Sequence, residues 1–175
     1  MTVIAVRVKK KTIEIAGDSQ TTWGDHKMPK KNSSDKQVQS FGKIFQTNGL
    51  TLGCAGSVAH IGLLQIFSKT HAPKEMERDS ILDWFIEFKE WVLDKAKINF
   101  SDILMHGIII RDGKAFAFYD FMEVSRIYEF DAVGSGMFLA IGALELGATT
   151  EQAVNVAIKY DLYCGGSANK ITIKI

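Results

Sequence analysis

The sequence alternates β-hairpins with pairs of helices, and this order constrains its fold more than any other feature. Two segments with alternating apolar residues, 2–8 and 12–16, predict a first hairpin. Segments 43–47 and 50–54 predict a second, because Asn48-Gly49 between them supplies the positive φ angles of a tight turn. Antiparallel strands need only such short turns, so each hairpin is expected to lie in an antiparallel sheet.

Apolar residues at helical spacing follow the second hairpin and return in the C-terminal third. The predicted helices are 57–69, 80–96, one from Gly134-Ser135-Gly136 to near Gly147, and 149–160. The later predicted strands are 103–110, 114–119, 124–130 and 170–175. Asp79 or Ser80 is expected to cap the second helix, and Thr149 with Gln152 has the spacing of a capping box.

Each helix pair must cover one face of a sheet to bury its apolar side. Two antiparallel sheets packed face to face, with a helix pair outside each, would bury every apolar face in this order. The predicted fold is therefore α+β, a four-layer αββα sandwich. A chain of 175 residues fits one domain, residues 1–175, with a single sizeable core.

Charge and hydropathy exclude several classes of function. The chain has 21 Lys and Arg against 20 Asp and Glu, whereas a nucleic-acid surface needs a clear basic excess. No segment has the roughly 18 uninterrupted apolar residues of a membrane span. Lysines 9–11 follow the first apolar stretch, unlike the charges of a signal peptide, and two cysteines cannot form a disulfide framework. We therefore expect a cytoplasmic protein without nucleic-acid or membrane partners.

No metal or cofactor site is predicted. The four histidines are scattered, and no pair has helical ligand spacing. Gly134-Ser135-Gly136 is not a dinucleotide loop, because the third glycine would fall at Leu139 and no βαβ unit surrounds it. Packing or helix entry explains these glycines better. The polar segment 17–40 is too long for a routine connection and is expected to be a functional or a mobile loop.

The beginning of the chain carries the residues most specific for catalysis. Removal of Met1 would leave Thr2 with a free α-amino group beside its hydroxyl. The pKa of such a group is about 7.7–8.0. The amino group could accept the hydroxyl proton if a cation, a carboxylate that orients the cation and a backbone N–H for the oxyanion lay nearby. Asp18, Lys43 and Gly56 are of these types. Each also has an ordinary structural explanation, so spacing alone leaves both interpretations open.

Five blocks of the sequence, in order, resemble the bacterial HslV peptidases, which are proteasome β-type subunits. The blocks are residues 1–7 with 15–24, 43–46, 54–57, 132–136 and 161–166. The resemblance covers the whole chain and implies the N-terminal-nucleophile (Ntn) hydrolase fold. The short N-terminus, with no evident propeptide, favours HslV itself or the related β-proteobacterial proteasome homologue (BPH).

The resemblance implies a role for each matching residue. In the catalytic centre, Thr2 matches the nucleophile, Asp18 the acid that orients the lysine, Lys43 the cation that lowers the pKa of the amine, Gly56 the oxyanion donor, and Ser135 and Asp161 the polar residues that support the amine. Thr22, Cys54 and Val58 match residues that contact substrate, and the pocket is expected to prefer apolar side chains.

Two departures from the family pattern bear on these assignments. The segment before Lys43 is longer than usual, so Lys36 is the alternative catalytic lysine. Lys43 is preferred because Ile44-Phe45-Gln46 follows it, as in the family. Cys164 stands where the family usually has a serine, and a thiol is a poorer hydrogen-bond donor.

The function implied by the resemblance is a threonine-type endopeptidase without a cofactor. The family forms stacked rings with enclosed active sites, so the implied partners are copies of this chain, a peptide or unfolded-protein substrate and an ATP-driven unfoldase. Two alternatives stay open. One is a catalytically silent scaffold that retains Met1, and the other is an amidohydrolase of the same fold that acts on a small amide.

Overall fold

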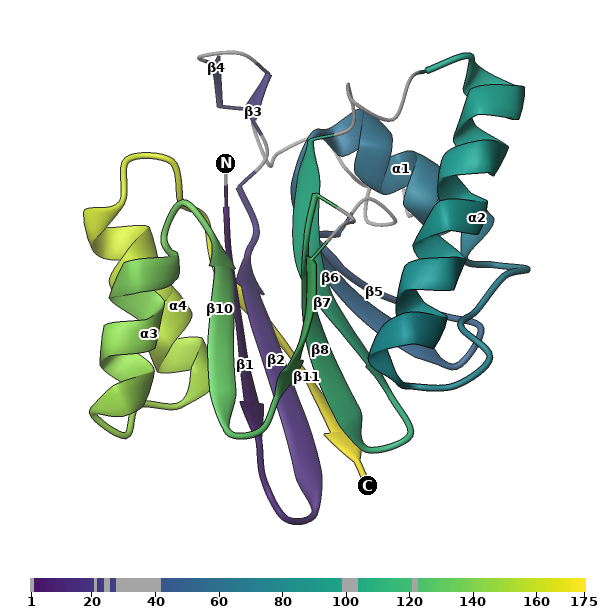
Figure 1. The fold of residues 1–175 in the computed structure, drawn as a ribbon. Helices are drawn as coiled ribbons and strands as arrows, with labels where there is room; N and C mark the ends of the chain where they lie inside the picture. Colours follow the sequence, from purple (N-terminus) through teal and green to yellow (C-terminus); the bar gives the residue numbers. More distant parts are fainter. Residues whose placement is uncertain (1, 21, 24–25, 28–41, 99–103, 121–122) are drawn as a thin grey trace.

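The structure, a computed structural model, describes residues 2–20, 22–23, 26–27, 42–98, 104–120 and 123–175. Its strands form two large antiparallel sheets (Figure 1). The first has the order β10 (Phe130–Gly134), β1 (Val3–Val8), β2 (Thr12–Asp18) and β11 (Ala168–Lys174). The second has the order β5 (Ile44–Thr47), β6 (Leu50–Gly56), β7 (Met105–Arg111), β8 (Lys114–Tyr119) and β9 (Glu123–Ile127). Two short strands, β3 (Thr22–Trp23) and β4 (His26–Lys27), pair with each other.

Two helix pairs cover the outer faces of the sheets. Helices α1 (Val58–Phe67) and α2 (Arg78–Ala96) lie on the second sheet, and α3 (Met137–Glu145) and α4 (Thr150–Tyr160) lie on the first (Figure 1). The α+β fold and the four αββα layers predicted from the sequence are confirmed. Within the described residues, no helix is both long and apolar enough to cross a membrane.

Three apolar layers hold the sandwich together. Between the sheets, alternate residues of β1 and β2 such as Ile4 and Ile15 pack against Ile108 and Ile110 of β7. Under α3 and α4 the layer is rich in alanine, which lets these helices approach the first sheet closely. Under α1 and α2 it is aromatic instead, with Phe67 in contact with Trp84 and Phe88.

The turns and one helix cap follow the sequence closely. Asn48 and Gly49 have φ angles of 46° and 75°, so the predicted turn is confirmed. The capping box is also confirmed, because Thr149 Oγ1 accepts the N–H of Gln152 at 3.2 Å and Gln152 Oε1 accepts the N–H of Thr149 at 2.9 Å. The predicted cap of α2 was wrong. Its N-cap is Glu77 without a side-chain cap, and Ser80 Oγ accepts the N–H of Glu75 instead.

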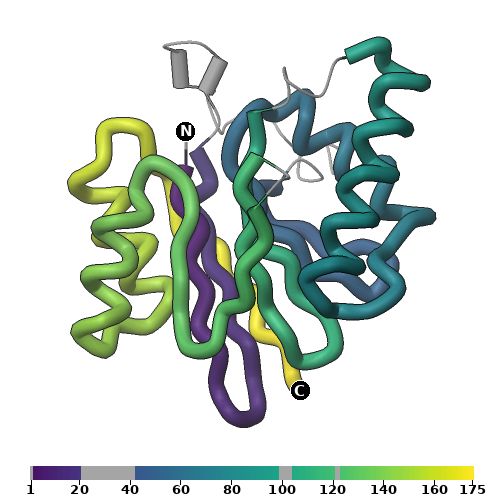
Figure 2. The backbone as a smooth tube through the Cα atoms, viewed as in Figure 1, coloured from purple at the N-terminus to yellow at the C-terminus, as the bar shows by residue number. Residues whose placement is uncertain are grey.

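The predicted strand 124–130 is in fact parts of two strands in different sheets. β9 ends at Ile127, and β10 begins at Phe130 and pairs with β1, from Val3 opposite Gly134 to Arg7 opposite Phe130. Periodicity cannot distinguish these two partners, because both strands bury apolar side chains. The crossing completes the first sheet and brings residues 134–136 beside the start of β1. Figure 2 shows this N-terminal end of β1 at one end of the sandwich and the C-terminus of the chain at the other.

Replacing Phe67 by Ala is expected to lower the free energy of unfolding by about 3–5 kcal/mol, because the ring is buried among other aromatic rings. Urea unfolding followed by tryptophan fluorescence at fixed protein concentration measures the change. Ile66→Ala is the matched control on the same helix, since Ile66 is 54 % exposed and its loss should change stability by only about 0.5 kcal/mol. Equal changes in the two variants would contradict the packing assigned to α1.

Candidate active site

The carboxylate of Asp18, at the end of β2, is the centre of the candidate site. Its side chain is fully buried. Oδ1 accepts the Thr2 hydroxyl, the N–H of Val3 at 3.0 Å and the Lys43 ammonium at 2.7 Å. Oδ2 accepts the N–H of Gly165 at 3.1 Å. Four donors from three separate parts of the chain therefore converge on one buried anion, as a buried charge requires.

Lys43 lies immediately before β5 and reaches across to the first sheet. Its side chain is 15 % exposed, and burial lowers the pKa of its ammonium from the ordinary value of 10.5, while Asp18 acts in the opposite direction. Cys164 lies close enough to act on the same ammonium. Burial raises the pKa of the Cys164 thiol to about 12, so this thiol is neutral near pH 7 and Asp18 is the anion that holds Lys43.

Residues 134–136 pack against the backbone carbonyl group of Thr2. Ser135 Oγ lies 3.3 Å from that carbonyl oxygen, and the N–H of Gly136 donates to it at 3.4 Å. Gly134 has a φ of +101°, and a Cβ there would lie 2.8 Å from the Thr2 carbonyl carbon and would overlap its oxygen. These glycines therefore serve close packing and helix entry, as the sequence predicted.

Asp161 joins this part of the site from the C-terminal end of α4. Its Oδ1 accepts the N–H groups of Tyr163 at 2.7 Å and Cys164 at 3.1 Å. Ser135 Oγ lies 3.4 Å from the same oxygen and 3.8 Å from the Cys164 sulfur. Ser135 thus links Thr2 to Asp161, so a chain of contacts connects five of the six predicted catalytic residues.

The sixth, Gly56, ends β6 at the same end of the sandwich. It is exposed and has a φ of +129°, and a Cβ there would lie 2.9 Å from the Cα of Met105. Only glycine fits this conformation and spacing without strain. The structure records no hydrogen bond that joins Gly56 to Thr2, so its oxyanion role stays a prediction.

The predicted substrate contacts are distributed over different environments. Val58, in the first turn of α1, is 46 % exposed near Gly56. Cys54 is fully buried in the apolar layer under α1 and α2, and burial raises the pKa of its thiol far above the ordinary value. The backbone of Thr22 pairs with Lys27 in the short β3–β4 sheet. Met1 and Lys36 lie outside the described residues.

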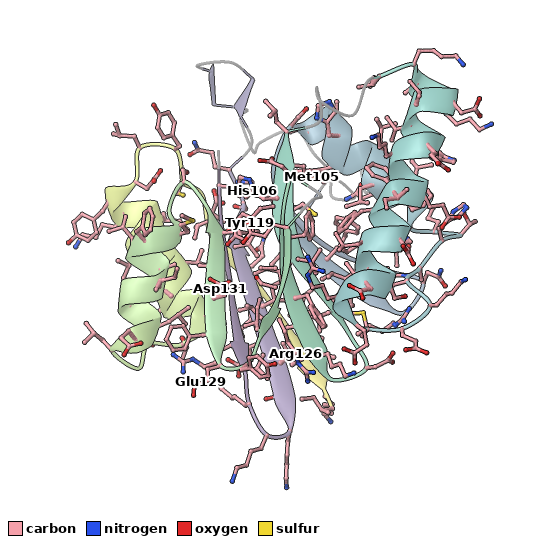
Figure 3. All side chains as sticks on the ribbon, in the orientation of Figure 1. Met105, His106, Tyr119, Arg126, Glu129 and Asp131 are labelled. Carbon is pink, nitrogen blue, oxygen red and sulfur yellow. The ribbon has the colours of Figure 1, made fainter. Side chains whose placement is uncertain are left out.

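Sequence reasoning missed a group of titratable side chains between the sheets. The rings of His106 on β7 and Tyr119 on β8 have centroids 6.2 Å apart, and Figure 3 shows both rings with Asp131 of β10 in this region. Burial lowers the pKa of His106 and raises those of Tyr119 and Asp131. The alternation of His106 with Ile108 and Ile110 on β7 was the available signal.

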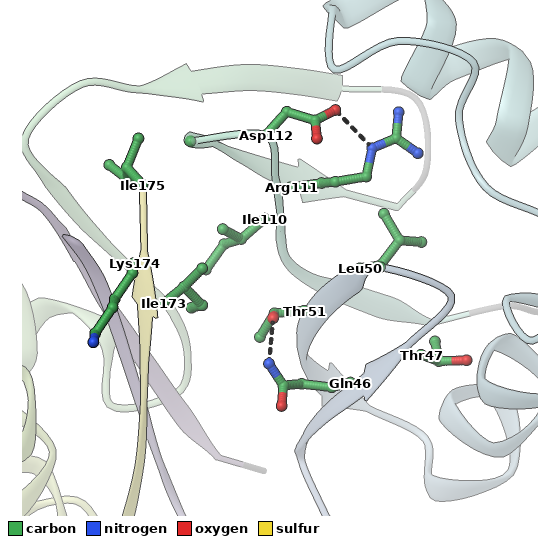
Figure 4. A pocket seen from close by; sticks show the side chains of 12 residues that line it. Gln46, Thr47, Leu50, Thr51, Ile110, Arg111, Asp112, Ile173, Lys174 and Ile175 are labelled. Atoms are coloured by element: carbon green, nitrogen blue, oxygen red, sulfur yellow. Dashed lines mark hydrogen bonds and ion pairs between the residues drawn. The ribbon is translucent and has the colours of Figure 1, made fainter. Parts of the chain in front are cut away.

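A cavity of about 420 Å³ opens at the opposite end of the sandwich, away from Asp18. Its walls are the β5–β6 and β7–β8 turns and the end of β11, with Ile110 facing Ile173 across it (Figure 4). Gln46 donates to Thr51 at 3.1 Å within this wall. None of the predicted catalytic residues lines this cavity, so it is separate from the candidate site.

The candidate site offers a hydroxyl, a buried carboxylate and a cation at Thr2, the residue that precedes β1. In such a set the ammonium group keeps its proton beside the carboxylate, and its charge can stabilise the alkoxide that the hydroxyl forms during acyl transfer. Among the described residues, no three His, Cys, Asp or Glu side chains are placed to hold a metal ion. The Thr2 hydroxyl, the Asp18 carboxylate and the Lys43 ammonium are groups that can take part in nucleophilic and acid–base chemistry.

Replacing Gly134 by Ala is expected to lower the free energy of unfolding by about 1–3 kcal/mol, because the positive φ and the contact with the Thr2 carbonyl both oppose a Cβ. Gly142→Ala is the matched control, since nothing lies within 4 Å of a Cβ at this position in α3. It should raise stability by up to about 1 kcal/mol through helix propensity. Thermal and urea unfolding measure both, and equal effects would contradict the tight packing at Gly134.

Comparison with known proteins identifies the fold. No protein-family model matches the sequence, and no curated protein matches it. BPH from Thiobacillus denitrificans superposes with a TM-score of 0.82 over 98 % of this chain and 97 % of that one, at 18 % identity, and a second structure of it is a complex with epoxomicin.

Two further proteins share this architecture. Eukaryotic HslV from Trypanosoma brucei superposes with a TM-score of 0.72 over 99 % of both chains, at 18 % identity. Anbu, the ancestral beta-subunit from Yersinia bercovieri, has a TM-score of 0.70 over 97 % of this chain and 80 % of that one, at 13 % identity. The chain therefore has the proteasome-like Ntn-hydrolase fold.

Proposed function

We propose that this chain is the catalytic subunit of a threonine-type endopeptidase that assembles into proteasome-like stacked rings. The observation that carries the proposal is the buried Asp18 carboxylate, which binds both the Thr2 hydroxyl and the Lys43 ammonium. A hydroxyl, a carboxylate and an ammonium group in mutual contact just before β1 support the roles of nucleophile, orienting acid and cation. A fold likeness to HslV and BPH adds support.

In the proposed mechanism, removal of Met1 frees the α-amine of Thr2. Thr2 Oγ1 attacks the carbonyl carbon of a peptide bond, and its proton passes to the α-amine directly or through one water. Lys43 stabilises the alkoxide and keeps the amine neutral, and Asp18 holds Lys43 in place. The N–H of Gly56 is proposed to donate to the oxyanion.

The amine then gives its proton to the leaving nitrogen as the peptide bond breaks and the acyl-enzyme forms. A water molecule attacks this ester, its proton returns through the amine to Thr2 Oγ1, and the free carboxylic acid leaves. Ser135 and Asp161 orient the amine, since Ser135 lies against the Thr2 carbonyl and Asp161. Thr22 and Val58 are proposed to contact substrate, and Cys54 to lie beneath the side-chain pocket.

The proposed partners follow from the same fold. Copies of this chain would form the rings, unfolded polypeptide would be the substrate, and an ATP-driven unfoldase would deliver it. A cytoplasmic location is consistent with two buried thiols that form no disulfide.

One observation favours a second candidate function, a catalytically silent scaffold. Thr2 is only 2 % exposed and its hydroxyl already donates to Asp18, as suits a residue with a purely structural role. The intact mass of the protein from its native cells separates the two candidates. Loss of Met1 supports the peptidase, and retention of Met1 supports the scaffold.

Thr2→Ala is expected to lower peptide hydrolysis by about 10³-fold or more, because nucleophile and amine act as one unit. Fluorogenic peptide cleavage and native mass measure activity and assembly. The matched control is Thr172→Ala, at an exposed threonine of β11, which should keep full activity. A peptide epoxyketone should add its mass to the N-terminal peptide of the wild-type protein and leave that of Thr2→Ala unmodified. Full activity in Thr2→Ala would remove Thr2 from the mechanism.

Lys43→Ala is expected to lower kcat by about 10²-fold or more, whereas Lys36→Ala should leave kcat unchanged. Because burial lowers the pKa of Lys43 below 10.5, activity should fall on the alkaline side before an ordinary lysine loses its proton. A pH–rate profile of the wild type measures this limb. Circular dichroism checks folding, since loss of Lys43 leaves Asp18 buried without its cation, and Lys43→Arg keeps the charge. The opposite ranking of the two alanine variants would move the assignment to Lys36.

A further inference from the structure

Three consecutive backbone amides, those of residues 163–165, bind both halves of the candidate site. The N–H groups of Tyr163 and Cys164 donate to Asp161, and the next one, from Gly165, donates to Asp18 Oδ2 at 3.1 Å. This short segment therefore bridges the carboxylate that holds Lys43 and the carboxylate that contacts Ser135. The distance between the two halves depends on where the segment lies.

Ser19 fixes the far end of this segment. Its Oγ accepts the N–H of Ser167 at 2.9 Å and lies 3.2 Å from Ser167 Oγ. In the adjacent β2–β11 pairing, Ala168 lies opposite Asp18. The Ser19–Ser167 hydrogen bond thus extends the β2–β11 pairing by one position beyond Asp18.

Gln20 fixes the middle of the segment by packing. It is 9 % exposed, which is unusual for a glutamine. A Cβ on Gly165 would lie 2.8 Å from Gln20 Cδ and would overlap Oε1, so the side chain lies directly against the Gly165 backbone. The φ of Gly165 is not positive, so the contact with Gln20, and not backbone strain, demands glycine at this position.

We propose that Ser19 and Gln20 are positioning residues that clamp residues 163–167 and so keep the Gly165 N–H on Asp18 and Asp18 against Lys43. This inference rests on the proposed function. Neither residue contacts the reacting atoms, and both act through the Asp18 carboxylate. Loss of the clamp would let the segment open and Asp18 lose one of its four donors.

The first experiment compares Ser19→Ala with Ser19→Thr, which keeps a hydroxyl acceptor. Hydrogen–deuterium exchange of residues 163–167 should be about fivefold to tenfold faster in Ser19→Ala, because one hydrogen bond is lost, and near wild type in Ser19→Thr. In the active enzyme, kcat should fall by a similar factor with KM unchanged. Thr149→Ala is the matched control, since it removes the same kind of bond at the opposite end of α4 and should leave this exchange unchanged.

A second readout does not depend on turnover. Asp18 opposes the lowering of the Lys43 pKa, whereas the Cys164 thiol near the same ammonium is neutral near pH 7. The pH dependence of Lys43 acetylation by acetic anhydride should therefore move to lower pH in Ser19→Ala and Gln20→Ala, and stay unchanged in Thr149→Ala. If the wild type never cleaves peptides, the proposed function fails, and the exchange and acetylation data still test the clamp.

A double variant tests the contact between Gln20 and Gly165. Gly165→Ala alone should displace the Gln20 side chain and speed exchange of residues 163–167. Gly165→Ala combined with Gln20→Ala should exchange more slowly than Gly165→Ala, because the new methyl group occupies the space that Gln20 leaves. Unchanged exchange and unchanged Lys43 acetylation in Ser19→Ala and Gln20→Ala would overturn the proposal, as would faster exchange with an unaltered Lys43 profile.

Discussion

The structure depends on the compensation of one buried negative charge. An isolated carboxylate inside a protein is costly, and it is tolerated only when cations and hydrogen-bond donors surround it. Asp18 obtains its donors from the start of β1, from Lys43 ahead of β5 and from Gly165 ahead of β11. Lys43 lies directly before β5 of the second sheet and Asp18 ends β2 of the first, so this interaction ties the two sheets together at the end where the candidate site lies.

Small residues bring the remaining parts of the site within reach of Thr2. Gly134 and Gly136 remove the side chains that would collide with Thr2 and Val3, and the alanines of α4 let the helix approach the same strand. Asp161 ends that helix, so close packing of α4 also sets the position of the Asp161 carboxylate. The aromatic layer under α1 and α2 has no such role and stabilises the other half of the sandwich.

The two cysteines lie in different surroundings. Both thiols are buried and neutral, yet Cys54 lies in an apolar layer while Cys164 lies 3.8 Å from Ser135 Oγ. A neutral thiol beside Ser135 can offer only a weak hydrogen bond. Asp18, and not this thiol, therefore binds the Lys43 ammonium as an anion, which makes the geometry of the segment around Gly165 important.

Much of the fold and part of the candidate site could be predicted because the signals are local. The hairpin turn at Asn48-Gly49 needs particular φ angles, and the capping box at Thr149 needs only two residues at fixed spacing. The residue types Thr2, Asp18 and Lys43 could also be picked out, because a proposed chemistry requires each of them. The predicted strands 2–8 and 43–47 begin at Thr2 and Lys43, and the predicted strand 12–16 ends just before Asp18.

By itself, the sequence determined the order of elements, the αββα layers and the residue types of the site, since periodicity and turn chemistry act over a few neighbouring positions. Only the tertiary structure decided that β10 joins the first sheet, that Cys54 is buried away from the surface, that the Gly165 amide donates to Asp18 and that Ser19 Oγ accepts the N–H of Ser167. The Gly165 and Ser19 contacts join residues more than a hundred positions apart in the chain. The sheet that β10 joins is a choice between equally apolar partners. Local pattern carries no information about such choices, because packing of the whole sandwich sets them.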